Sequence, residues 1–81
     1  MGKRVGVVAI IIEDKESIPM VNRILSKYAE IIIGRMGVPY KEKNLNIISA
    51  IIDGTTDEIG GLTGQLGKLQ GVAVKSALSK N

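Results

Sequence analysis

The sequence contains no cysteine and no histidine among its 81 residues. Without cysteine the chain can form neither a disulfide framework nor a thiolate metal site, and without histidine it lacks the commonest transition-metal ligand and the usual general base. Any metal or acid–base chemistry would depend on carboxylates, and the acidic residues near the expected helices are explained by helix capping. The sequence therefore predicts no catalytic residues, no metal site and no cofactor.

Phenylalanine and tryptophan are also absent, and Tyr28 and Tyr40 are the only aromatic residues. Sheets that read single-stranded RNA stack bases on aromatic side chains, but here Tyr28 falls on a helix stripe and Tyr40 in a hairpin. The net charge of +3 is dispersed, with no run of five or more like charges. We expect no direct binding to nucleic acid; the mild basicity indicates either a solvated surface or anionic partners.

No stretch of the chain reaches the roughly 18 apolar residues of a membrane span. The start, Met1 to Arg4 followed by an apolar octet, superficially copies a signal peptide. That octet ends in the charged segment 13–16, with no small-residue cleavage site. These features predict a cytoplasmic protein that does not enter a membrane.

Four segments rich in β-branched residues are apolar on both of their alternating faces. They are 5–12, 31–38, 45–52 and 72–78. A strand that is covered on one side only normally alternates apolar and polar residues. The expected sheet is therefore apolar on both of its faces.

Helical spacing of apolar residues occurs twice between these segments. The two stripes are Ile18, Val21, Ile24, Leu25 and Tyr28, and then Ile59, Leu62, Leu66 and Leu69. Pro19 is tolerable only in the first turn of its helix, which favours Ser17 over Asp14 as the N-cap. Thr55 and Glu58 stand at the spacing of a capping box for the second helix.

The resulting order of strand, helix, strand, strand, helix, strand is typical of the ferredoxin-like α+β sandwich. We therefore expect a single domain over residues 1–81 with an antiparallel sheet in the order 4-1-3-2. The charges agree with this order, because the two expected edge strands carry Arg35 and Lys75 while the central strands carry none. Pro39 is expected to end the second strand before a hairpin.

Both helices of such a fold pack on one side of the sheet, which leaves the other apolar face uncovered. A homo-oligomer, either a dimer or a tetramer through the sheet, would bury this surface with one repeated interface. The alternatives are that the face is a tolerated hydrophobic surface or that a different protein covers it.

Glycines interrupt two of the expected elements. Gly34 and Gly37 flank Arg35 inside an otherwise strong strand, which indicates either contact with a ligand or partner or an edge strand twisted and charged against aggregation. In the second helix Gly60, Gly64 and Gly67 fall opposite the apolar stripe. They indicate either a smooth surface for close approach or simply a poor helix.

Nearly the whole chain resembles a known family. The runs that carry the resemblance are RVGVVAIIIED, IIIGRMGVPY, IISAIIDGTTDEI and LTGQLGKLQGVAVKSA. They are similar to the regulators of iron-only hydrogenase systems, whose fold is similar to ACT domains and to the C-terminal domain of the nickel-responsive repressor. The resemblance implies a non-enzymatic regulatory domain that senses a small ligand or binds a partner protein.

By analogy with ACT domains, an effector would sit between subunits, either near the turn 13–17 or against the strand that carries Gly34 and Arg35. The candidate ligand-binding residues are Asp14, Gly34, Arg35, Met36 and Gly37. Nickel sensing is disfavoured because the histidine and cysteine ligands of the related repressor have no counterpart here. The alternative to a sensor is a structural module that assembles without any ligand.

Overall fold

Four strands form one antiparallel sheet in the order β2-β3-β1-β4 in the computed structural model, which describes residues 2–80. This order confirms the ferredoxin-like arrangement expected from the sequence. The strands are β1 (Arg4–Ile12), β2 (Ile32–Tyr40), β3 (Leu45–Gly54) and β4 (Val72–Leu78). The α-helices are α1 (Ile18–Lys27) and α2 (Thr56–Gly67), and short 3₁₀ turns occupy Lys15–Ser17, Ala29–Ile31 and Lys41–Lys43.

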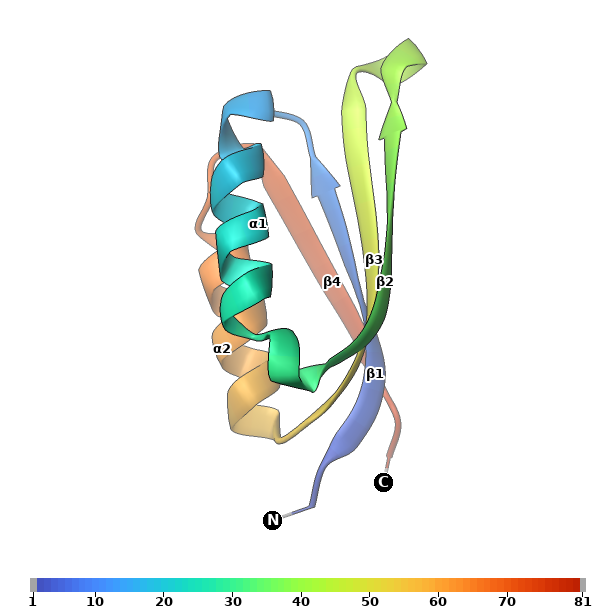
Figure 1. Cartoon of the computed structure of the whole chain (residues 1–81), viewed down its shortest axis with the longest axis vertical. Coiled ribbons are helices and arrows are strands. Elements are labelled where there is room, and N and C mark those ends of the chain that lie inside the picture. Colours follow the sequence, from blue (N-terminus) through green and yellow to red (C-terminus); the bar gives the residue numbers. More distant parts are fainter. Residues whose placement is uncertain (1, 81) are drawn as a thin grey trace.

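Both α-helices lie on the same side of the sheet, as Figure 1 shows. The apolar stripes of the helices face the sheet and bury Val21, Ile24 and Leu25 of α1 together with Ile59, Leu62 and Leu66 of α2. Leu69 follows the end of α2 and packs at the margin of this core. The periodicity of the sequence thus identified the helical part of the core correctly.

The register of the strands separates the two faces of the sheet. On the face beneath the helices, Val8 lies opposite Ala50 and Ile10 opposite Ile48, and Val8, Ile10 and Ala50 are fully buried. We call the other side the open face. It carries Val5, Val7, Ala9 and Ile11 of β1, Leu45, Ile47, Ser49, Ile51 and Asp53 of β3, Met36, Val38 and Tyr40 of β2, and Ala73, Lys75 and Ala77 of β4.

The N-terminus of α1 differs in detail from the expectation. Ser17 occupies the N-cap position, but its hydroxyl does not cap the helix and instead donates a hydrogen bond to the carbonyl oxygen of Gln70 at 2.7 Å. Asp14 accepts a hydrogen bond from the backbone N–H of Glu16 at 3.0 Å and so caps the 3₁₀ turn that precedes α1. Pro19 lies in the first turn of α1, as expected.

The capping box of α2 is confirmed. The Thr55 hydroxyl accepts a hydrogen bond from the backbone N–H of Glu58 at 3.1 Å, and the Glu58 carboxylate accepts one from the backbone N–H of Thr55 at 2.9 Å. After the helix, Gly71 adopts the left-handed conformation with φ of +69°, whereas Gly67 remains helical. The left-handed residue therefore opens the turn into β4 rather than capping α2 itself.

The expectation that Pro39 ends the second strand is wrong. Strand β2 continues through Pro39, which lies opposite Asn46, and ends at Tyr40. The physical reason is that β2 is an edge strand, where alternate backbone N–H groups face away from the sheet and a missing donor can be tolerated. A bulge between Ile32 and Gly34 shifts the register at the other end of the strand.

Candidate functional site

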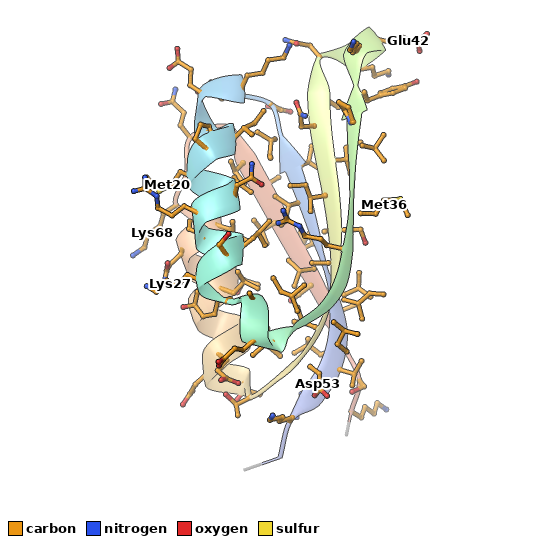
Figure 2. All side chains as sticks on the ribbon, viewed as in Figure 1. Met20, Lys27, Met36, Glu42, Asp53 and Lys68 are labelled. Atoms are coloured by element: carbon orange, nitrogen blue, oxygen red, sulfur yellow. The ribbon has the colours of Figure 1, made fainter. Side chains whose placement is uncertain are left out.

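Strand β2 divides the candidate residues Gly34 to Gly37 between the two faces of the sheet, because neighbouring side chains in a strand alternate. Arg35 lies opposite Ala50, which the helices bury, so Arg35 is on the helix side of this edge strand. Met36 lies opposite Ser49 on the open face, and Figure 2 shows its side chain on the side away from the helices. One short segment therefore presents groups to two separate surfaces.

A hollow of about 340 Å³ lies between α1 and β2. Its lining consists of Leu25 and Ser26 of α1, Ala29 of the following turn, and Ile32, Gly34 and Arg35. Within residues 2–80 no hydrogen bond or ion pair engages the guanidinium of Arg35. The hollow thus combines an apolar lining with one hydroxyl and one unpaired cation. We call it the Arg35 hollow.

A second hollow of about 240 Å³ opens on the other side of the same strand and is lined by Gly34, Arg35, Met36, Ser49 and Ile51. Gly34 and Arg35 border both hollows, and a Cβ placed on Gly34 would meet no atom within 4 Å. A Cβ on Gly37 would only touch Ile48 Cγ1 at 3.8 Å, an ordinary contact. Crowding within the chain therefore does not require glycine at either position.

Asp14 lies far from the Arg35 hollow. Arg35 aligns with Ala50 and, through it, with Val8 of β1, whereas Asp14 follows Val8 by six residues toward the other end of the sheet. At about 3.3 Å per residue, the four residues from Val8 to the end of β1 at Ile12 already span roughly 13 Å, and Asp14 lies beyond them. Asp14 has a role of its own there, since it caps the 3₁₀ turn and packs against Gly71. One chain therefore does not bring Asp14 and Arg35 together.

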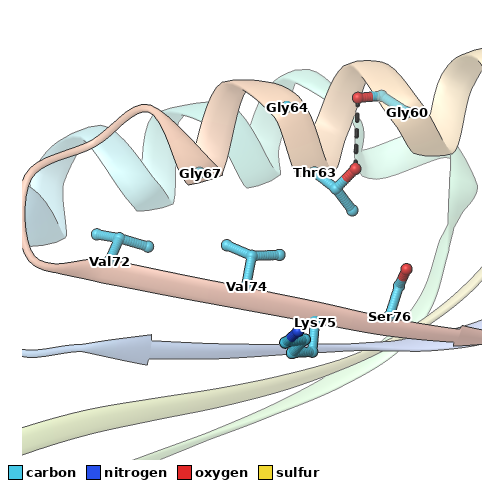
Figure 3. A pocket seen from close by; sticks show the side chains of 8 residues that line it. All are labelled: Gly60, Thr63, Gly64, Gly67, Val72, Val74, Lys75 and Ser76. Atoms are coloured by element: carbon cyan, nitrogen blue, oxygen red, sulfur yellow. Dashed lines mark hydrogen bonds between the residues drawn. The ribbon is translucent and has the colours of Figure 1, made fainter.

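The glycines of α2 line a groove of about 570 Å³ between this helix and β4, which Figure 3 shows from close by. The lining residues are Gly60, Thr63, Gly64, Gly67, Val72, Val74, Lys75 and Ser76. A Cβ on Gly60, Gly64 or Gly67 would meet nothing within 4 Å, and the Thr63 hydroxyl donates back to the carbonyl oxygen of Ile59 at 3.0 Å. The glycine surface expected on the outside of α2 thus faces this groove beside an edge strand.

Gly61 has a different role, which sequence analysis missed. A Cβ at this position would lie 2.6 Å from the hydroxyl oxygen of Tyr28, which accepts a hydrogen bond from Gln65 Nε2 at 2.9 Å. Gly61 therefore makes room for a polar side-chain contact between α2 and Tyr28, the residue that follows the end of α1. Only the pairing of the two helices brings these residues together.

Carboxylates do not gather into a reactive cluster in the part of the chain that the structure describes, where no three Asp or Glu side chains are placed to hold a metal ion. The pKa of Glu58 is lowered because the backbone N–H of Thr55, and then its hydroxyl, donate hydrogen bonds to the carboxylate. Across residues 2–80, no helix is both long and apolar enough to cross a membrane.

Comparison with solved structures identifies similar folds over nearly the whole chain. The structure of an uncharacterized protein, TM1266 from Thermotoga maritima, is 34% identical, with a TM-score of 0.92 over 96% of this chain and 99% of that one. The C-terminal domain of MgtC from Mycobacterium tuberculosis is 16% identical, with a TM-score of 0.74 over 99% of this chain and 92% of that one. The ACT domain of GTP pyrophosphokinase from Chlorobium tepidum is 23% identical, with a TM-score of 0.64 over 100% and 91% of the two chains.

These likenesses show an ACT-like fold. Among proteins with curated functions, none matches this sequence. A family model for TM1266-like iron-only hydrogenase system regulators matches residues 4–76, which is most of the chain. The protein therefore belongs to the TM1266-like family of iron-only hydrogenase system regulators.

Proposed function

We propose that this protein is a non-enzymatic regulatory domain of an iron-only hydrogenase system, that it works as an oligomer, and that it responds to a small anionic ligand. The ligand would bind in the Arg35 hollow. The observation that carries this proposal is the guanidinium of Arg35, which borders a hollow of about 340 Å³ and has no partner within residues 2–80. Family membership supports the regulatory part of the proposal.

The lining of the Arg35 hollow indicates the chemical class of the ligand. Leu25, Ala29 and Ile32 provide an apolar wall, and Ser26 adds a hydroxyl. A guanidinium presents several N–H donors in a planar fork that matches a carboxylate or a phosphate. A small molecule with one such anionic group and a short apolar part would satisfy both halves of the hollow.

The position of the hollow on an edge strand supports a regulatory role. A ligand held between α1 and β2 would fix the distance between a helix and the outermost strand of the sheet. Edge strands carry backbone groups with which another chain can pair. A bound ligand would hold β2 in one position, so the liganded strand would offer a partner a different surface from the unliganded strand. Any effect on transcription would then pass through a partner protein.

Thermal unfolding with a panel of carboxylates, amino acids and nucleotides tests the ligand. A compound present at 100 times its dissociation constant stabilises the folded chain by about 2.7 kcal/mol, which raises the Tm of a domain of this size by roughly 10–20 °C. Arg35→Ala should abolish the shift. Arg23→Ala is the matched control, because Arg23 is also exposed but lies on α1 outside the hollow.

A structural module that assembles without a ligand is the second candidate, and the apolar open face is the observation that favours it. Absence of a thermal shift across the panel, together with an intact oligomer, would support this candidate. A shift of equal size in Arg35→Ala and the unsubstituted chain would show that the ligand binds elsewhere and would contradict the site proposed here.

A further inference from the structure

Large apolar side chains are concentrated on the open face. Of the nine that are well exposed in residues 2–80, seven stand on this face and the other two, Met20 and Ile33, lie on α1 and at the bulge of β2. The seven are Val5, Val7, Ile11, Met36, Val38, Tyr40 and Ile51, with exposures from 39% to 67%. The charged residues that the strands contribute to this face are Asp53 near the end of the central strand β3 and Lys75 on the edge strand β4.

The open face is large enough to support a specific interface. Strands lie about 4.8 Å apart and rise about 3.3 Å per residue, so four strands of this length cover roughly 20 Å by 25 Å, or about 500 Å². Two such faces in contact would bury about 1,000 Å² or more, because side chains that stand above the backbone add area. That value reaches the lower limit of specific protein–protein interfaces, which is about 1,000 Å² in total.

The sizes of the side chains on the open face make its shape self-complementary. Its β2 side carries the large residues Met36, Val38 and Tyr40, whereas its β4 side carries Ala73 and Ala77. Lys75 stands between these two alanines, and because β4 is an edge strand its long side chain can keep the ammonium in water beyond the interface. Between these two sides, the small residues Ala9 and Ser49 lie opposite each other at the centre. The high side of one copy can therefore meet the low side of another while the two central strands approach closely.

We propose that the open face binds the open face of a second copy of this chain, with the two-fold axis parallel to the strands and between β3 and β1. The inference rests on the oligomer in the proposed function and is independent of the ligand. This axis sets β2 of one copy over β4 of the other. An axis perpendicular to the strands would instead stack β2 on β2 and bring the two copies of Lys75 together, which like charge disfavours.

Sedimentation equilibrium of the full chain measures the association. We expect a dimer, or a multiple of it, at micromolar concentration, and Val7→Lys should raise the dissociation constant by about 100-fold or more. Met20→Lys is the matched control, because Met20 is exposed to 42% and Val7 to 43% but Met20 lies on α1. A chain that is monomeric at about 100 μM, or a Val7→Lys variant that associates as the unsubstituted chain does, would overturn the inference.

Ser49→Lys is a second variant that tests the same interface if Val7→Lys does not fold. Ser49 is already polar and exposed, so the folded monomer should tolerate lysine there, as circular dichroism would show. The longer side chain should nevertheless hold the two sheets apart and produce monomers. A folded Ser49→Lys variant that still dimerises would contradict face-to-face packing.

Introduced cysteines test the direction of the axis, and the absence of native cysteine makes the result unambiguous. Val38 and Ala73 lie at the same level of the sheet, on opposite edge strands, since Val38 faces Ile47, Ile47 faces Ile11, and Ile11 faces Ala73. A mixture of Val38→Cys and Ala73→Cys chains should form a disulfide or a short bismaleimide cross-link, whereas either variant alone should not. Efficient cross-linking of Val38→Cys to itself would refute the proposed axis.

The two proposals can fail separately. A monomeric chain that still binds an anion through Arg35 would contradict only the inference about the open face. A dimer with the expected cross-links and no ligand across the panel would contradict only the ligand site.

Discussion

Replacing Gly71 with alanine is expected to destabilise the protein markedly, because this residue joins three constraints in one turn. Its φ of +69° lies in the left-handed region, and a Cβ would stand 2.6 Å from Asp14 Cβ and 2.9 Å from the backbone nitrogen of Asp14. Its carbonyl oxygen also accepts a hydrogen bond from the backbone N–H of Glu13 at 2.7 Å. The turn therefore cannot move away from Asp14 without loosening the end of the β1–β4 pairing.

The magnitude follows from these contributions. Left-handed backbone costs a residue with a Cβ about 1–2 kcal/mol, and forcing an extra carbon against backbone atoms costs about 1–3 kcal/mol. Alanine offsets about 0.4–1 kcal/mol of this loss of stability, because it restricts the conformations of the unfolded chain. The net loss is about 1–4.5 kcal/mol, centred near 3 kcal/mol, and a loss of about 3 kcal/mol corresponds to a decrease in Tm of roughly 12–24 °C for a domain of this size.

Urea unfolding followed by circular dichroism measures this loss. The midpoint should fall while the slope m stays unchanged, which identifies a change in stability rather than in compactness. Gly64→Ala is the matched control, since a Cβ there meets nothing within 4 Å and helix propensity should add about 1 kcal/mol of stability. A Gly71→Ala variant as stable as the unsubstituted protein would refute the reasoning about this turn.

Three further predictions concern α2. Thr55→Ala removes the N-cap and should cost about 1 kcal/mol in urea unfolding, whereas a midpoint within error of the unsubstituted chain would contradict the role of the capping box. Glu58 has a lowered pKa in the folded state, so its contribution to stability is complete above its unfolded pKa and is lost as the pH falls through the folded value; Glu58→Gln should remove this part of the pH dependence of unfolding. Gly61→Ala should displace the Tyr28 hydroxyl and break its hydrogen bond with Gln65, at a net cost of about 1 kcal/mol, and Tyr28→Phe should relieve most of that cost in a double-mutant cycle.

Local patterns in the sequence were sufficient for the fold. Apolar periodicity located both helices and all four strands, and the capping box at Thr55 and Glu58 depends only on residues within one turn. The sheet order followed from the element order and the handedness of crossovers. Pro39 shows where local rules fail, because the tolerance of a strand for proline depends on whether that strand lies at an edge.

The arrangement of the candidate site could not be predicted from single residues, because it depends on which strands and helices lie next to each other. The sequence analysis grouped Arg35 and Met36 in one candidate site, although alternation along a strand would have placed them on opposite faces. The distance between Arg35 and Asp14 required the register of three strands. The contact of Tyr28 with Gln65 joins residues 37 positions apart. No local signal distinguishes Gly61, which fits against Tyr28, from Gly60 and Gly64, which border an open groove.

Only one layer of backbone separates the two faces of the sheet at β2, where the adjacent residues Arg35 and Met36 belong to opposite surfaces. If one surface holds the anion and the other holds the second copy, any coupling free energy between the two events would pass through this strand. Thermodynamic linkage then requires reciprocity: the factor by which effector strengthens or weakens dimerisation equals the factor by which dimerisation changes affinity for effector. A titration of effector at several protein concentrations would reveal that allosteric factor directly.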